Sequence, residues 1–331
     1  MKNTLYIFSN GRLKRKENTI YFETEDGKRK FVPVENTKEI FIFGEVDLNT
    51  KMLNFLSQKE IILHYFNYYG YYSGSFYPRE HYNSGYMILK QAKAYMDPVK
   101  RLYLAKMFIR GAAENALKTM KYYLNRGKDL RWHIEETEKL IKMLEKQSSI
   151  DKAMAIEGNL KQKYYDSFNL IINKEDFSFV RRKKHPPKDQ INAMISFANS
   201  LIYTYVLSEI YQTHLDPRIG FLHSTNFRRF TLNLDVAEIF KPIIGDRTIF
   251  ALLNKSEISK KDFEKKLNGI VLNEKGKRKF LEKIEDKLKQ TIKHPTLKKN
   301  VSYRRLIRLE LYKIEKDLMG EKEYEPFVMQ W

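Results

Sequence analysis

The hydrophobic pattern of this 331-residue chain changes near residue 80, from one typical of strands to one typical of helices. From Leu5 to about Phe76, segments rich in Ile, Val, Phe and Tyr indicate β-strands, and Asp26-Gly27 is a strong hairpin signal. Beyond Ile88, apolar residues recur at intervals of three and four. The sequence therefore predicts a two-domain α+β chain: a small β-rich N-terminal domain over residues 1–80, a linker over 81–90 and a larger all-α C-terminal domain over 91–331.

Three segments support more detailed expectations. The run NTKMLNFLSQKE predicts a helix capped by Asn49 or Thr50 inside the β-rich domain. The tyrosine-rich run IILHYFNYYGYYSGSFYP predicts strands with glycines at the bends. Its rings could stack on bases, but packing on the sheet or on a second subunit is the better interpretation. The lysine-dense segment 255–299 predicts two or three surface helices whose lysines are mostly solvated.

The chain is strongly basic, with 61 Lys and Arg against 41 Asp and Glu, a formal charge of +20 and a pI near 9.6. Such a surplus repels itself unless a polyanion neutralises it, so nucleic acid is the first partner to consider. Proteins that bind an anionic membrane surface usually do so through one basic amphipathic helix or a polybasic tail. In this chain the basic residues recur along the whole length instead. The uncharged stretches 61–78 and 190–208 are interrupted by polar side chains or glycine, so they predict core and no membrane span.

Several catalytic signatures are missing. The chain has no cysteine, which excludes a thiol nucleophile, disulfides and cysteine-based zinc sites. It also has no Walker loop, no GxGxxG after a strand, no HExxH and no GxSxG. The apolar run near the N-terminus breaks at Ser9 and is too short for a signal peptide, so we expect a cytoplasmic protein. Catalysis would have to use histidine and oxygen ligands, with a metal ion or as acid–base pairs.

Acidic and histidine side chains occur in segments that otherwise predict core. A helix over LNLDVAEIF would place Asp235 and Glu238 on one face, where two carboxylates repel unless a cation lies between them or one is protonated. His223 ends the loop LDPRIGFLH and could face this pair, and Glu157 on another apolar-faced helix would add a further acid. Two carboxylates and an imidazole suit Mg²⁺ or Mn²⁺, whereas zinc would recruit more histidine or cysteine.

Each of these signals is weak alone, because a lone Glu on a helix is usually solvated and a lone His is usually structural. From the residues themselves, two interpretations stay open. One is a metal site that polarises a phosphodiester. The other is a non-enzymatic nucleic-acid-binding protein in which a buried Glu-His-Glu network is structural. A metal-dependent hydrolase acting on a small anionic substrate is a third alternative.

Two short basic runs lie near these segments. One, FVRRKKHPPKD, comes just before a predicted buried helix, and the other lies between His223 and Asp235. Phosphate contacts by such side chains are independent of base sequence and sensitive to salt. The alternative is that these side chains are solvated surface charges that contact no phosphate. We favour this alternative less for the second run. The predicted DNA-binding residues are Arg181, Arg182, Lys183, Lys184, Arg228 and Arg229.

Five segments match a known family in order and spacing: IEGN, RRKKHPPKDQINAMISFANSLIY, LDPRIGFLH, LNLDVAEIFKP and RLIRLELYKIEKDLMGEKEYEPF. With them the chain resembles the CRISPR-associated endonuclease and integrase of spacer acquisition, the first-numbered Cas protein family. The run FVPVENTKEIFIFGEVDLNTKMLNFLSQKEIILHYFNYYGYYSGSFYP is similar to the β domain of that family. The resemblance thus covers nearly the whole chain.

The resemblance implies a divalent-metal-dependent enzyme that joins the 3′-hydroxyl of a captured DNA fragment to the CRISPR repeat by transesterification. The family's glutamate-histidine-acid triad falls on Glu157, His223 and Glu238, and its neighbouring acid falls on Asp235, which would support the metal or assist proton transfer. Many members carry Asp where this chain has Glu238. The resemblance therefore leaves open whether Asp235 or Glu238 is the closer metal ligand, and we favour Glu238.

The resemblance also implies partners. They are double-stranded and possibly branched DNA, a second copy of the chain bound through the β-rich N-terminal domain, and a small ferredoxin-like protein that bridges two such homodimers.

Overall fold

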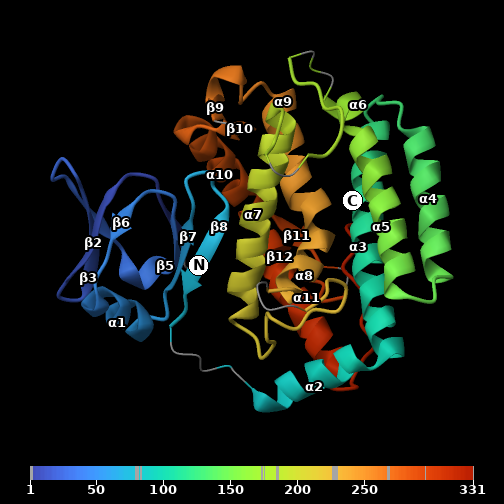
Figure 1. The fold of residues 1–331 in the computed structure, drawn as a ribbon, viewed down its shortest axis with the longest axis horizontal. Coiled ribbons are helices and arrows are strands. Elements are labelled where there is room, and N and C mark those ends of the chain that lie inside the picture. Colours follow the sequence, from blue (N-terminus) through green and yellow to red (C-terminus); the bar gives the residue numbers. More distant parts are fainter. Residues whose placement is uncertain are drawn as a thin grey trace. The chain divides into compact units, whose positions relative to one another are not determined.

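The computed structural model divides into two compact units, Met1–Tyr82 and Asn83–Trp331. Figure 1 shows that the first is rich in strands and the second is mainly helical, which confirms the predicted α+β class. The boundary falls inside the predicted linker. The structure describes residues 3–78, 82, 84–172, 174, 176–183, 186–225, 230–266, 269–294 and 296–330.

Two four-stranded sheets and one helix form the first unit. One sheet has the order β1-β5-β7-β8, in which β1, β5 and β7 are parallel and β8 is antiparallel to β7. The other has the order β4-β3-β2-β6. Buried side chains from both sheets and from α1, among them Leu13, Ile40 and Phe55, share one core. The elements are β1 (Asn3–Ile7), β2 (Gly11–Lys16), β3 (Thr19–Thr24), β4 (Arg29–Val32), β5 (Thr37–Ile42), β6 (Val46–Asp47), α1 (Thr50–Gln58), β7 (Ile62–Phe66) and β8 (Tyr72–Phe76).

The local signals of the first unit are confirmed. Asn49 caps α1, because its side chain accepts a hydrogen bond from the Met52 amide at 3.0 Å. Gly27 has φ +79° in the turn between β3 and β4, a conformation that favours glycine. The tyrosine-rich run forms the antiparallel pair β7–β8, with Gly70 in the connecting turn.

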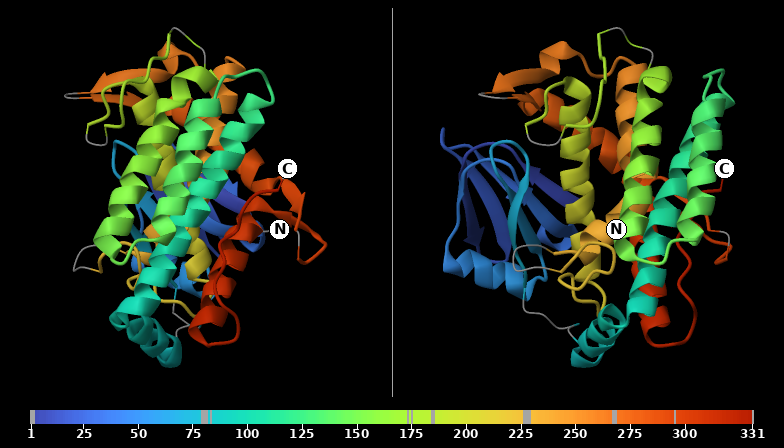
Figure 2. Two further views of the ribbon diagram at one scale, coloured as in Figure 1. Left: turned by 90° about the vertical axis from the view of Figure 1, so that its right-hand side faces the viewer. Right: turned by 45° about the vertical axis from the view of Figure 1, so that its right-hand side comes forward.

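Helix α7 is buried along nearly its whole length and packs against α8, α9 and α11. Helix α8 packs on both α7 and α3, and α3, α4 and α5 stand side by side (Figure 2). Polar side chains on α8 are therefore carried into an interior between two other helices. The helices are α2 (Gly85–Met96), α3 (Pro98–Leu124), α4 (Arg131–Glu145), α5 (Ile150–Asp166), α6 (Phe168–Ile172), α7 (Gln190–Ile210), α8 (Leu232–Phe240), the π-helical turn η2 (Lys241–Asp246), α9 (Arg247–Asn254), α10 (Glu274–Lys289) and α11 (Tyr303–Leu318).

Two expectations for the second unit need correction. The unit is not all-α. The lysine-dense segment and the three residues after it hold one long helix, α10, between two strand pairs: β9 (Phe263–Lys266) with β10 (Gly269–Leu272), and β11 (Thr291–Lys293) with β12 (Asn300–Ser302). These strands are only three or four residues long and lie among many lysines. The alternation of apolar and polar side chains that predicts a strand is therefore too short to recognise. The linker is also shorter than predicted, because Ser84 caps α2 and residues 85–90 are helical.

None of the helices in the described ranges combines the length and the hydropathy that a membrane crossing requires. The two uncharged stretches predicted as core coincide with the pair β7–β8 and with the buried helix α7.

A largely buried ion-pair cluster fastens α11 to α7. The Glu209 carboxylate accepts hydrogen bonds from the Arg304 Nε at 2.5 Å and the Arg308 Nε at 2.6 Å. The Glu209 side chain is only 2% exposed, and both arginine side chains are less than one fifth exposed. Forming such a cluster costs free energy, because its charged groups lose water. Removing one partner is nevertheless strongly destabilising, because it leaves the other charge buried and unpaired.

We predict that Glu209→Ala lowers the free energy of unfolding by about 3–5 kcal/mol, because it removes the carboxylate from two poorly solvated guanidiniums. Urea denaturation followed by circular dichroism measures the change. The control is Asp176→Ala, which removes an exposed carboxylate paired with Lys260 at 2.7 Å and should leave the midpoint unchanged. Equal effects of the two substitutions would mean that the Glu209 cluster stabilises the protein no more than a surface ion pair does.

Candidate metal centre

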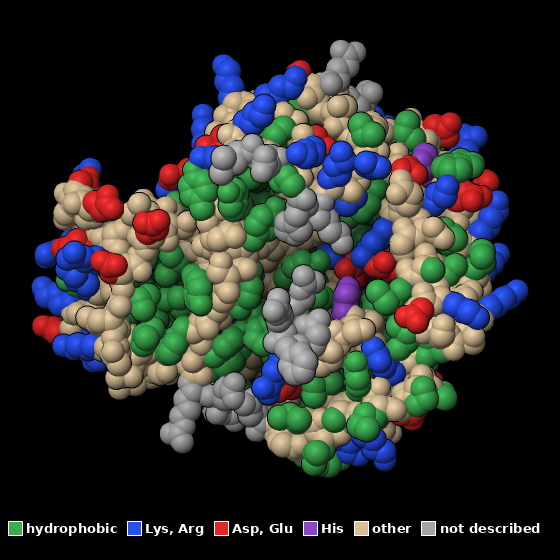
Figure 3. Space-filling model, viewed as in Figure 1, with side chains coloured by type: hydrophobic (Ala, Val, Ile, Leu, Met, Phe, Trp, Pro, Cys, Tyr) green, Lys and Arg blue, Asp and Glu red, His purple; other side chains and the backbone are tan. Residues whose placement is uncertain are grey.

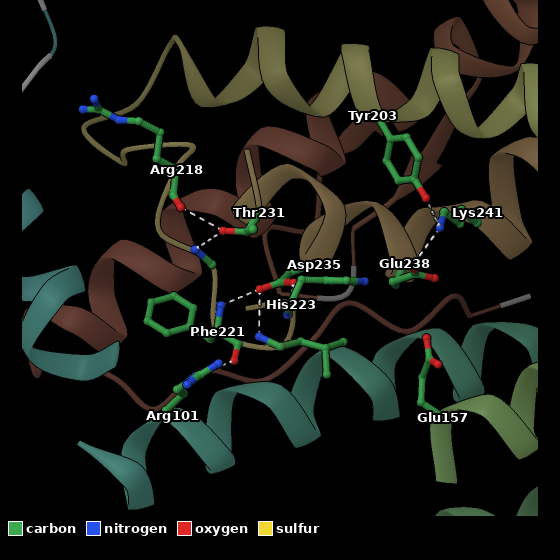
Figure 4. Close-up of polar contacts among 12 residues, drawn as sticks. Arg101, Glu157, Tyr203, Arg218, Phe221, His223, Thr231, Asp235, Glu238 and Lys241 are labelled. Atoms are coloured by element: carbon green, nitrogen blue, oxygen red, sulfur yellow. Dashed lines mark hydrogen bonds and ion pairs between the residues drawn. The ribbon is translucent and has the colours of Figure 1, made fainter. Parts of the chain in front are cut away.

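The buried carboxylate of Asp235 organises the loop that carries His223 (Figure 4). Its Oδ2 accepts hydrogen bonds from the backbone amides of Phe221 at 2.5 Å and Leu222 at 3.0 Å. Its Oδ1 accepts from the His223 amide at 3.0 Å and contacts the His223 Nδ1 at 2.7 Å. Asp235 is fully buried, so these four contacts are what make its charge tolerable inside the protein.

The contact between Asp235 and His223 also fixes the state of the imidazole. The Asp235 carboxylate accepts this hydrogen bond and the His223 Nδ1 donates it, so in the neutral imidazole the lone pair lies on Nε2. A carboxylate behind a histidine in this way orients metal-binding imidazoles in many proteins. The His223 side chain is 30% exposed.

Gly220 allows the loop to come this close to α8. A Cβ at Gly220 would lie 2.7 Å from both the Asp235 Oδ2 and the Thr231 carbonyl carbon, closer than real Cβ atoms approach. The Gly220 amide donates to the Thr231 hydroxyl at 2.8 Å, and that hydroxyl donates to the Arg218 carbonyl at 2.8 Å. The requirement for glycine here comes from close packing and not from a positive φ.

Side chains from α2 and α3 hold the other side of the loop. The buried Gln91 donates to the carbonyls of Asp216 and Ile219, both at 3.1 Å, and accepts from the Asp216 amide at 2.7 Å. Arg101 donates to the Phe221 carbonyl at 3.0 Å. The loop therefore has hydrogen-bonding partners on three helices.

Glu238 lies one turn beyond Asp235 on α8 and contacts two lysines. Its Oε1 accepts from the Lys241 Nζ at 2.6 Å, and its Oε2 pairs with the Lys161 Nζ at 3.1 Å. The Lys161 ammonium also pairs with Glu157, one turn earlier on α5. Lys241 donates in addition to the Tyr203 hydroxyl at 2.7 Å. Two carboxylates from different helices thus converge on one ammonium.

The ion pairs outweigh burial in setting the charge of this cluster. Burial alone would raise the pKa of Glu238, but Lys161 and Lys241 hold it well below its usual range. Burial would lower the pKa of both lysines, but the Glu238 carboxylate raises the pKa of each, aided at Lys161 by Glu157. Glu238 and the two lysines are therefore charged at neutral pH. Asp246 differs, because burial raises its pKa to about 7 against the opposing influence of Lys241.

A cavity of about 50 Å³ lies beside these side chains, with room for a few water molecules. Its charged lining comes from Glu157, Lys161, Glu238, Lys241 and Asp246, and Ile109 with three alanines of α3 forms an apolar wall. Figure 3 shows acidic, basic and histidine side chains gathered in one hollow over the second unit.

The donor set fits a hard divalent cation. Within the described ranges, no three His, Asp or Glu side chains are grouped closely enough to ligate a metal as they stand. Instead an ammonium stands between Glu157 and Glu238, which face one another in Figure 4. His223 is near enough to Glu238 to lower the pKa of that carboxyl. Two carboxylates that already converge on a cation, with an imidazole nitrogen nearby, suit Mg²⁺ or Mn²⁺.

The predicted DNA-binding residues differ in their exposure and in their hydrogen-bond partners. Arg181 and Lys183 are exposed. Arg182 instead donates to the Asn192 side chain at 2.8 Å and the Ser196 hydroxyl at 3.0 Å, so its guanidinium is held against α7. Contact of these three with DNA stays a prediction. Lys184, Arg228 and Arg229 lie outside the described residues.

Sequence reasoning missed Lys161 and Lys241. Each follows an acidic residue by four or three positions, a spacing that ordinarily indicates a solvated surface ion pair. The one available signal was that Lys241 directly follows the apolar run of α8. The role of Gln91 had no sequence signal at all.

We predict that Gly220→Ala disrupts the His223 loop, because the added Cβ overlaps the Asp235 carboxylate. Overpacking of this kind costs about 1–3 kcal/mol, which thermal denaturation detects. Gly158→Ala on α5 is the matched control: a Cβ there meets nothing within 4 Å, and alanine favours the helix. A Gly220→Ala protein as stable as the Gly158→Ala protein would refute the requirement for close approach at Gly220.

Comparison with known proteins shows the family of this chain. Residues 5–286 match the family model described as CRISPR associated protein Cas1. The chain is 61% identical over 331 residues to the CRISPR-associated endonuclease Cas1 2 of Thermodesulfovibrio yellowstonii, with all of both chains covered.

Solved structures agree as well. A Cas1 protein from Thermotoga maritima matches with TM-score 0.88 and 46% identity, covering 98% of this chain and 99% of that one. A casposase bound to integration product matches with TM-score 0.90 at 20% identity, covering 99% of this chain and 93% of that one, and so shares the fold. With a family model that spans most of the chain and full-length relatives of this identity, the chain belongs to the Cas1 family of CRISPR-associated proteins.

Proposed function

We propose that the protein is a divalent-metal-dependent DNA endonuclease and integrase of CRISPR adaptation. The observation that supports this most is the convergence of Glu157 and Glu238 on one cation, near an imidazole whose Nδ1 donates to Asp235. The full-length relative from Thermodesulfovibrio yellowstonii carries the name endonuclease, which supports the reaction class. The net charge of +20 suits a DNA substrate.

In this proposal Glu157, His223 and Glu238 hold Mg²⁺ or Mn²⁺. When bound, the ion would polarise a phosphodiester and stabilise the charge that develops as a 3′-hydroxyl attacks it. The reaction exchanges one phosphodiester bond for another when the attacking group is the 3′-hydroxyl of a captured fragment, and it is hydrolysis when the attacking group is water.

Asp235 acts through His223 and is not itself a ligand, because both of its oxygens are already used by the loop. It keeps the proton on Nδ1 and holds the ring in place. Lys241, anchored by Tyr203, keeps Glu238 ionised. Exposed Arg181 and Lys183 would bind backbone phosphates without reading base sequence.

The partners and the location belong to the same proposal. We propose a homodimer formed through the strand-rich first unit, a double-stranded and possibly branched DNA substrate, and a small ferredoxin-like partner that bridges two dimers. We place the protein in the cytoplasm, which its lack of cysteine suits.

We predict that Glu157→Gln, His223→Ala and Glu238→Gln each reduce strand transfer by about 100-fold or more, because stabilisation of charge by a metal is worth several kcal/mol. The assay joins a labelled duplex with free 3′-hydroxyls to a supercoiled plasmid in the presence of Mn²⁺ or Mg²⁺. Asp151→Asn is the control, since Asp151 is exposed at the start of the same helix as Glu157.

The alternative, a non-enzymatic DNA-binding protein with a structural network, gives different results. It predicts that no strand transfer occurs with any protein, that metal has no effect, and that the three substitutions lower only thermal stability. Adding the ferredoxin-like partner to the wild-type reaction separates a missing partner from a missing activity. Strand transfer by wild type and by all three variants at equal rates would refute the proposed site.

A further inference from the structure

Lys161 stands at the position that a cation shared by Glu157 and Glu238 would take. Its Nζ pairs with the Glu157 Oε1 on its own helix and with the Glu238 Oε2 on α8 at 3.1 Å. The two carboxylates belong to helices far apart in the sequence, so a local helical ion pair does not explain the arrangement. The ammonium joins α5 to α8 where the proposed site is formed.

The second lysine of the cluster has a different environment. Lys241 donates to both Glu238 and the Tyr203 hydroxyl, and its ammonium lies 4.6 Å from the centre of the Tyr203 ring. Its side chain is 11% exposed, whereas that of Lys161 is 35% exposed. Lys241 is therefore anchored, and Lys161 is the lysine that can withdraw into solvent.

The charge balance makes such withdrawal necessary. Glu157 and Glu238 carry two negative charges, which Lys161 and Lys241 neutralise. A divalent ion between the same carboxylates would leave an excess of two positive charges in a largely buried cluster, or of one when Asp246, whose pKa is about 7, is ionised. Like charges at this distance repel strongly where water is scarce. The ion and the Lys161 ammonium therefore compete for the same carboxylates.

We propose that Lys161 is an internal counter-ion, which holds Glu157 and Glu238 together in the metal-free protein and which a divalent ion must displace. This inference rests on the proposed function, because it takes those two glutamates as metal ligands. Loss of the lysine charge should then strengthen metal binding and weaken the metal-free protein. The lysine would keep the site assembled before the metal arrives and limit metal binding by the free protein.

The experiment compares wild type with Lys161→Met and Lys161→Gln in the absence of DNA. Lys161→Met keeps most of the length of the side chain without its charge, and Lys161→Gln keeps a hydrogen-bond donor should the methionine variant fold poorly. Lys152→Met is the matched control, because Lys152 is an exposed residue of the same helix. Electron paramagnetic resonance of free Mn²⁺ gives the dissociation constant, and thermal denaturation is measured in chelator and in saturating Mn²⁺.

We expect both Lys161 variants to bind Mn²⁺ about 5- to 100-fold more tightly than wild type or Lys152→Met, the range typical of coupling between two sites. We also expect a lower melting temperature in chelator and a larger rise on adding Mn²⁺. Unchanged or weaker Mn²⁺ binding by both Lys161 variants would overturn the inference.

A further variant separates this inference from the proposed function. If wild type and the Lys161 variants bind Mn²⁺ equally and His223→Ala binds it more weakly, the counter-ion role is wrong and the metal centre stands. If Mn²⁺ binds to none of the proteins, the metal centre fails and the counter-ion role with it.

Discussion

The buried carboxylate of Asp235 is the constraint on which the rest of the site depends. Three successive backbone amides and one imidazole donate hydrogen bonds to it, which offsets the cost of burying it. Those contacts require the loop to lie against the start of α8, and that approach requires Gly220. The position and tautomer of His223 both follow from this one anion. We therefore assign different roles to the two acids of α8: Asp235 orders the His223 loop, and Glu238 pairs with the Lys161 and Lys241 ammonium groups.

The second requirement is that α8 be held between α7 and α3 so that its acids enter an interior. Asn115 of α3 contributes by donating to the Ile239 carbonyl at 3.0 Å and to the Phe327 carbonyl at 2.9 Å, which ties α8 to the C-terminal segment. Burying Glu238 there needs compensating charge, and Lys161 and Lys241 supply it. Some of the lysines of this basic protein thus neutralise carboxylates of the same chain.

Much of this could be predicted from sequence. The strand and helix periods predicted the two-part architecture. The four candidate site residues were weak signals by themselves, and their assignment stays a prediction that rests on the family resemblance. Short strands among lysines could not be recognised, because three or four residues show no clear period. The role of Lys161 depends on the approach of α5 to α8, and that of Gln91 on hydrogen bonds to residues 125 and 128 positions away. Contacts of this kind arise only from tertiary packing.

The central claim is that the Nε2 of His223 ligates a divalent ion held by Glu157 and Glu238. Pulsed electron paramagnetic resonance of the Mn²⁺-loaded protein tests it most directly, because a directly bound imidazole nitrogen couples to the electron spin of the metal. We predict nitrogen coupling from a single imidazole in wild type and its loss in His223→Ala under conditions where Mn²⁺ still binds. Absence of nitrogen coupling in wild type, or its persistence in His223→Ala, would contradict the account.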